Sequence, residues 1–76
     1  MEEAIVHFSE AARIRPNDAL TRNNLGVAYF KLGRLEEAIR EYRTALEIHP
    51  GFADAQRNLE IALSQLGHER KESNSR

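Results

Sequence analysis

Two asparagines, Asn24 and Asn58, occupy equivalent positions 34 residues apart. A carboxamide carries both hydrogen-bond donors and acceptors, so such a pair can bond to the N–H and C=O groups of an extended peptide, whatever the peptide's side chains are. The simpler interpretation is that each asparagine is a solvated residue on an exposed helix face. Because the two share a register, we carry the peptide-binding interpretation forward.

Side chains that could catalyse or hold a metal are present but are not grouped. His7, His49 and His68 lie in different segments, and none has a second ligand at zinc-like spacing. There is no glycine-rich phosphate loop, and Ser9 and Ser64 have no base arranged beside them. The sequence therefore predicts a protein that is not an enzyme and has neither a metal site nor a cofactor.

The composition narrows the choice of partners. The 76 residues form one domain at most, and their net charge of −1 is spread without a patch of one sign, so we expect no nucleic-acid and no membrane partner. No apolar run approaches the roughly 20 residues of a membrane span, and the acidic N-terminus does not resemble a signal peptide. The absence of cysteine favours a cytoplasmic location, although the sequence does not identify the compartment.

The asparagines belong to a longer self-similarity at the same offset. A fixed period of about 20 to 50 residues is typical of repeat arrays, in which each unit buries its apolar face against its neighbours. Such arrays usually bind other molecules and seldom catalyse. The aligned pairs include residues 2–5 with 36–39, Phe8 with Tyr42, Pro16 with Pro50, Ala28 with Ala62 and Leu32 with Leu66.

The spacing of apolar residues predicts four helices. Prolines should end the first and third, because the residue before a proline avoids the α region, and glycines should end the second and fourth by adopting the left-handed conformation. Asn17 or Asp18 is expected to cap the second helix. These helix-ending residues are Pro16, Gly33, Pro50 and Gly67, and the helices run over about residues 2–15, 19–32, 35–48 and 53–66.

Short connections make consecutive helices antiparallel neighbours, so the predicted fold class is all-α, with antiparallel helix hairpins stacked on one another. We expect one helical repeat domain over residues 1–67 and a polar flexible tail over residues 68–76, which contain no apolar residue. The domain divides into a half unit over residues 2–16, a full unit over 17–50, and a half unit or capping helix over 51–67.

Small and aromatic residues recur at fixed positions of the full unit: Gly26, Tyr29, Ala38, Tyr42, Ala45 and Pro50. This pattern resembles the tetratricopeptide repeat, and the resemblance extends over residues 2–67. Arg22 is the main departure, since it stands where the family usually has tryptophan or another large residue. The resemblance implies a short right-handed α-solenoid of four helices.

The resemblance also implies a function and a binding groove. It predicts a non-catalytic protein–protein interaction module that holds an extended peptide or a helix in a groove lined by the first helix of each unit. Asn24 and Asn58 resemble the asparagine ladder of O-linked N-acetylglucosamine transferase repeats, so a substrate-recruiting fragment of such an enzyme is a further alternative. The implied groove residues are Leu20, Asn23, Asn24, Val27, Phe30, Lys31, Asp54, Arg57, Asn58, Ile61, Ser64 and Gln65.

The sequence argues against one binding mode of the family, the capture of chaperone tails. Some members hold the C-terminal carboxylate of chaperone tails with a clamp of lysine, asparagine and arginine. Here Asn23 and Val27 stand where lysine and asparagine are required, and Asp54 with Asn58 replaces the last two cations. Asp54 would repel a carboxylate, so we do not expect chaperone-tail binding.

The register predicts an N-terminal end that lacks a partner. The first helix matches the second helix of a unit, so a preceding helix is missing. The alternative function is therefore self-association, in which the uncovered face forms a homodimer or completes a neighbouring array. The residues of this face are Ala4, Ile5, Phe8 and Ala11.

The C-terminal end is expected to be closed. Glu60 stands where Gly26 allows close helix contact in the preceding unit, and burying an unpaired glutamate is costly. The fourth helix should therefore expose a polar outer face, as the last helix of an array requires. The alternative is that Glu60 is simply tolerated.

Overall fold

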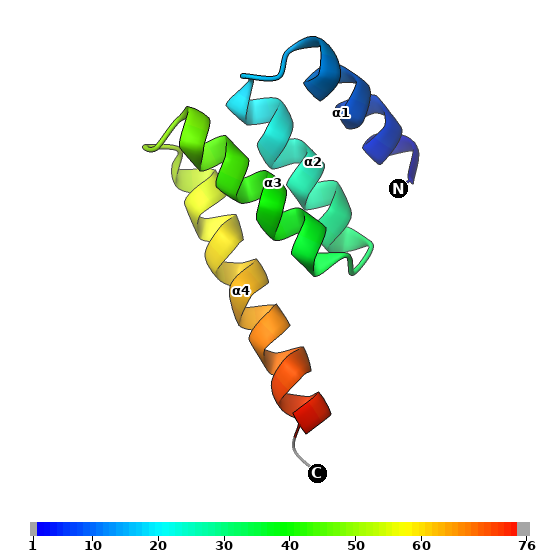
Figure 1. Cartoon of the computed structure of the whole chain (residues 1–76), viewed down its shortest axis with the longest axis vertical. Coiled ribbons are helices and arrows are strands. Elements are labelled where there is room, and N and C mark those ends of the chain that lie inside the picture. The colour runs from blue at the N-terminus through cyan, green and yellow to red at the C-terminus, as the bar shows by residue number, and fades with distance from the viewer. Residues whose placement is uncertain (1, 75–76) are drawn as a thin grey trace.

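The computed structural model describes the backbone of residues 2–74 and the side chains of residues 2–70. This part of the chain contains four helices and no strand, which confirms the predicted all-α fold. Consecutive helices run antiparallel and stack side by side, within a body of 45 × 28 × 14 Å (Figure 1). The helices are α1 (Glu2–Ile14), α2 (Ala19–Lys31), α3 (Leu35–Ile48) and α4 (Ala53–Asn74).

The start of α2 is fixed by Asp18, one of the two predicted caps. Its Oδ1 atom accepts hydrogen bonds from the backbone N–H groups of Leu20 at 3.1 Å and Thr21 at 3.4 Å. The Thr21 hydroxyl donates to the second carboxylate oxygen at 2.9 Å, and this hydrogen bond is the main cause that lowers the pKa of Asp18. The cap satisfies backbone donors that the first helical turn leaves unpaired.

The end of α2 is fixed by Gly33, as predicted. Its φ of 78° lies in the left-handed region, where a side chain would clash with the backbone. The turn lets the N–H of Gly33 donate to the carbonyl of Phe30 at 2.9 Å, and the N–H of Arg34 donate to that of Tyr29 at 3.0 Å. The chain thereby reverses into α3.

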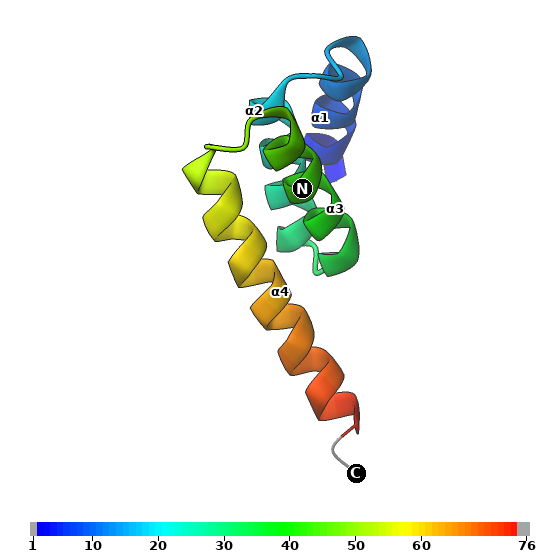
Figure 2. The same ribbon diagram turned by 60° about the vertical axis from the view of Figure 1, so that its left-hand side comes forward.

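The predicted end of α4 is wrong. The helix was expected to stop at Gly67 and to be followed by a flexible tail over residues 68–76, but it continues to Asn74. Figures 1 and 2 show it projecting past the start of α3. Residues 75 and 76 of the expected tail lie outside the described residues.

Gly33 and Gly67 precede segments of different polarity. After Gly33 the chain reverses and Leu35 becomes buried, whereas the segment after Gly67 contains no apolar residue that could stabilise a reversal by packing. A glycine inside a helix costs only about 1 kcal/mol, so the helix continues. An ion pair of 2.7 Å between Arg70 and Glu36 links this extension to α3.

The core lies where α3 packs between α2 and α4. Tyr42 is its largest fully buried side chain, and Ala38 lets the neighbouring backbones approach. Partly buried apolar residues of α2 and α4 pack around them. The core cluster consists of Ala38, Ile39, Tyr42 and Ala62, surrounded by Val27, Tyr29, Phe30, Leu59 and Leu66.

Arg22, the departure from the family pattern, is partly buried beside α3. Its Nη1 atom donates to Glu41 Oε1 at 3.2 Å, and its Nε has no partner among the described residues. The side chain lies with Ala12 and Leu25 around a hollow between α1 and α3. The aliphatic part of the arginine therefore occupies space that a large apolar residue would fill, and Glu41 balances its charge.

Burial raises the pKa of Tyr42 above its ordinary value of about 10. Between the unfolded and folded pKa values the unfolded chain binds fewer protons, so the free energy of unfolding should fall as the pH rises above about 10. We expect Tyr42→Phe to reduce this alkaline loss. Urea denaturation of both chains at pH 8 and above pH 10 measures it, and an equal loss in the variant would contradict the assignment.

Candidate functional site

Two neighbouring hollows, one on each flank of α2, bring half of the predicted groove residues together. The first, called the α2–α4 hollow, has a volume of about 210 Å³ and contains Asn58 and Ile61 of α4. The side chain of Tyr42 from α3 forms its floor. The residues that line the α2–α4 hollow are Val27, Phe30, Lys31, Tyr42, Asn58 and Ile61.

The second, called the α1–α2 hollow, has a volume of about 250 Å³. Val27 and Lys31 line both hollows and so form the ridge between them. Sequence reasoning did not place any residue of α1 in the groove, although the alignment of Phe8 with Tyr42 could have indicated it. The residues that line the α1–α2 hollow are Ala4, Phe8, Asn24, Val27, Ala28 and Lys31.

Asn23 does not belong to the open groove, and that part of the prediction is wrong. Its side chain is only 6% exposed, and its Oδ1 accepts a hydrogen bond of 3.0 Å from Asn58 Nδ2. A buried carboxamide requires such a partner. This bond fixes the orientation of Asn58 and leaves its carbonyl oxygen and second N–H for other partners. The structure gives Asn24 no side-chain hydrogen bond within the described residues.

The other predicted groove residues, apart from the buried Asn23, line neither hollow. Leu20 is one of them and exposes 59% of its surface, while Ile61, which lines the α2–α4 hollow, exposes 50%; both values are high for large apolar side chains. Asp54 and Arg57 are exposed and pair with each other at 2.9 Å, so the charge of Asp54 is balanced within α4. Ser64 and Gln65 are exposed on the same helix.

The predicted self-association face is only partly uncovered. Ala4, Ile5, Phe8 and Ala11 are all half-buried, and two of them line the α1–α2 hollow. Within α1 the most exposed large apolar residue is Val6, at 66%. The four residues are therefore partly accessible in the single chain, and self-association through them stays a prediction.

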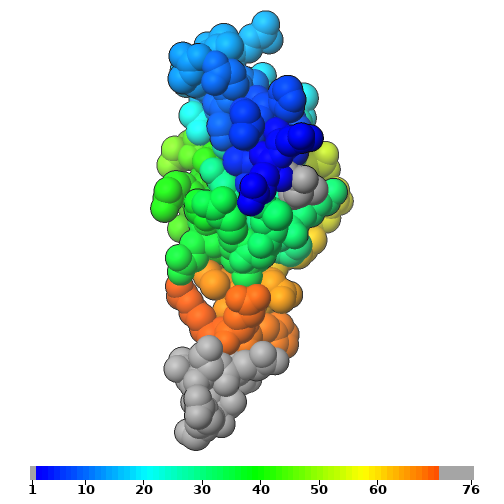
Figure 3. Space-filling view, turned by 90° about the vertical axis from the view of Figure 1, so that its right-hand side faces the viewer, coloured from blue at the N-terminus to red at the C-terminus, as the bar shows by residue number. Residues whose placement is uncertain are grey.

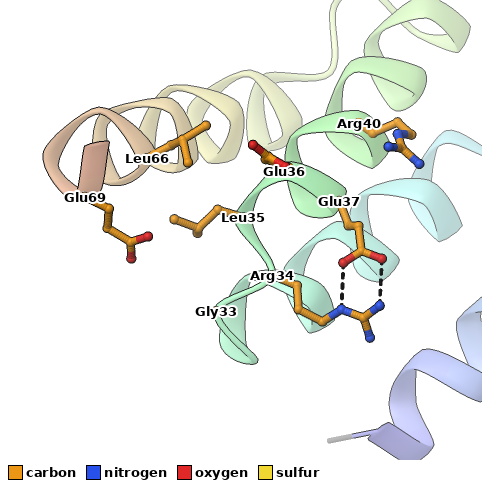
Figure 4. Close-up of a pocket in the computed structure, with 8 residues that line it drawn as sticks. All are labelled: Gly33, Arg34, Leu35, Glu36, Glu37, Arg40, Leu66 and Glu69. Carbon is orange, nitrogen blue, oxygen red and sulfur yellow. Dashed lines mark hydrogen bonds and ion pairs between the residues drawn. The ribbon is translucent and has the colours of Figure 1, made fainter. Parts of the chain in front are cut away.

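A larger hollow of about 460 Å³ lies away from the groove, where α4 passes the start of α3 (Figure 3). Figure 4 shows that its lining is mostly charged. Arg34 donates to both carboxylate oxygens of Glu37, at 2.6 and 2.7 Å, and lies 5.1 Å from the ring centre of Tyr29. The guanidinium of Arg34 therefore has its partners within the turn and the neighbouring helices. We assign this hollow a structural role.

Glu60 is exposed on the outer side of α4, as the prediction of a closed end requires. It accepts a hydrogen bond of 3.1 Å from Gln56 one turn earlier. At the equivalent position of α2, a β-carbon on Gly26 would lie 2.5 Å from the Tyr42 ring. A helix packed on α4 in the same way would therefore collide with the Glu60 side chain.

Two features are absent from the part of the chain that the structure describes. Among the described residues, no three or more histidine or acidic side chains are grouped closely enough to hold a metal ion. Within the same part of the chain, no helix has both the length and the apolar character needed to cross a membrane.

Two family models match the chain. Residues 19–52 match the tetratricopeptide repeat, and residues 1–33 match a second model described as TPR repeat. The first match begins at the first residue of α2 and has the 34-residue length of the internal period. No match was found among curated proteins.

Proposed function

Because the chain belongs to the tetratricopeptide repeat family, whose repeats generally act as protein–protein interaction modules, we propose that it binds a segment of a partner protein along the two hollows beside α2. One observation carries this proposal: two neighbouring hollows have apolar walls, and Ile61 in the lining of one of them stays unusually exposed, as does Leu20 of α2. Exposed apolar surface of this kind is typical of binding sites. A non-catalytic role fits the same surface, since its polar groups are amides and one lysine.

The proposal is tested with Ile61→Glu, which places a charge at the α2–α4 hollow. Ile61 is half exposed, so the fold should tolerate the change. Peptides selected from a random library on the unchanged chain should bind this variant at least about tenfold more weakly, because an anchor residue contributes more than about 1 kcal/mol. Fluorescence anisotropy with labelled peptides measures the affinity.

Val6→Glu is the matched control. Val6 is also an exposed β-branched residue, and it lines neither hollow. The control should keep full affinity for the selected peptides, and circular dichroism should show both variants folded. Equal affinity of all selected peptides for Ile61→Glu and the unchanged chain would reject the groove as the binding site.

Self-association through α1 is the second candidate. The observation that favours it is the pair of exposed apolar residues Val6 and Ile14 on α1, beside the half-buried face of Ala4 and Ala11. Burial of such residues against a second copy would stabilise both chains. Equilibrium sedimentation tests it: a folded monomer at high micromolar concentration would exclude this candidate, and a concentration-dependent dimer lost in Val6→Glu would support it.

A further inference from the structure

The two hollows are built alike, one repeat apart. Each has an aromatic residue from the underlying helix, Phe8 or Tyr42, and each has an asparagine on its wall, Asn24 or Asn58. The pairs are related by the 34-residue offset of the sequence. A surface that repeats an apolar hollow beside an amide suits a ligand that presents the same contact twice.

The charge on the ridge between the hollows is not balanced by the protein. Lys31 lines both hollows and is exposed, and no carboxylate of the described residues lies within 4.0 Å of its amino group. The cation of Arg57, in contrast, is paired with Asp54. A carboxylate on the ligand, placed between its two apolar side chains, would complement Lys31.

The distance across the ridge limits the conformation of the ligand. The hollows lie on opposite flanks of α2, and a helix with its side chains is about 10 to 12 Å wide. A polyproline II segment rises about 3.1 Å per residue with three residues per turn, so side chains at positions i and i+3 share one face about 9 Å apart. An α-helix would need positions i and i+7 to cover a similar distance.

The asparagines favour the extended ligand over the helical one. A polyproline II segment has no internal hydrogen bonds, so its backbone N–H and C=O groups need partners. Asn24 and the free groups of Asn58 can supply them at each hollow. A helix interior has already satisfied these groups and would leave the carboxamides unpaired at the interface.

From this arrangement we infer the ligand class: an extended peptide with two apolar side chains three positions apart and an aspartate or glutamate between them. This inference rests on the proposed function and narrows it. One apolar side chain enters each hollow, the acidic side chain pairs with Lys31, and the asparagines bond to the peptide backbone.

The test is a selection from a random-peptide phage library on the full chain, repeated on Lys31→Glu. The expected consensus on the unchanged chain has two apolar residues three positions apart, with an acidic residue at one of the two positions between them. When the selection is repeated on Lys31→Glu, lysine or arginine should replace the acidic residue between the two apolar positions. Peptides from the first selection should bind Lys31→Glu about tenfold more weakly, since an attraction of up to about 1 kcal/mol becomes a repulsion.

Arg43→Glu controls for net charge, because Arg43 is exposed on α3 and lines neither hollow. It should leave both consensus and affinity unchanged. Peptides that depend on Ile61 but show helical spacing, or that lack an acidic preference, would overturn the ligand class and leave the proposed function standing. Selected peptides that are all insensitive to Ile61→Glu would overturn the proposed function itself.

Discussion

Replacement of Tyr42 by alanine is expected to lower the free energy of unfolding by about 3 to 5 kcal/mol, as for other large aromatic residues removed from a core. Tyr42 is 2% exposed and packs where α2, α3 and α4 meet. A chain of 76 residues has a total stability of about 4 to 11 kcal/mol, so the expected loss is a large part of the total. Denaturant titration followed by far-ultraviolet circular dichroism measures the change.

Phe8→Ala is the matched control, because Phe8 is the equivalent residue one repeat earlier. It is only half-buried, so the loss should be about half as large. Tyr42→Phe should be close to neutral at neutral pH, because the structure gives the hydroxyl no hydrogen bond within the described residues. An equal loss for Phe8→Ala and Tyr42→Ala would contradict the assignment of the core to α3.

The sequence predicted the fold well because its signals are local. Asp18 and Gly33 act through backbone groups a few residues away, so their types and positions were enough to place both ends of α2. Gly67 shows the limit of this reasoning. It matches Gly33 in the repeat, yet a helix reverses at a glycine only if the next residues can pack, and the polar residues 68–74 offer no apolar side chain for that.

The candidate site was predicted less completely because it depends on which side of a helix faces a neighbour. Asn23 and Asn24 are adjacent in sequence but point about 100° apart around α2, so one is buried against Asn58 and the other lines a hollow. The contribution of Phe8 was missed for a related reason. It was assigned to a free face, and only the packing of α1 on α2 places it in the α1–α2 hollow.

Replacement by alanine is expected to change the stability in opposite directions at Gly26 and at Gly67, because only Gly26 packs closely against another side chain. Gly26 and Gly67 both lie inside helices, where alanine is favoured over glycine by about 1 kcal/mol. A β-carbon on Gly26 would lie 2.5 Å from Tyr42 Cε1 and 2.7 Å from Cδ1, whereas one on Gly67 would meet no atom within 4 Å. We therefore expect Gly67→Ala to stabilise the chain by about 0.5 to 1 kcal/mol.

Gly26→Ala should instead destabilise the chain, by up to about 2 kcal/mol, because an overpacking cost of about 1 to 3 kcal/mol outweighs a gain in helix propensity of about 1 kcal/mol. The Tyr42 ring cannot move aside easily, since it is enclosed by the core. Thermal and urea denaturation of both variants measure whether each substitution raises or lowers the free energy of unfolding. If the ring contact is the cause, Gly26→Ala should cost less in a Tyr42→Leu background, with a coupling of about 1 kcal/mol in the double-mutant cycle. Additive losses would assign the cost to some other contact of α2.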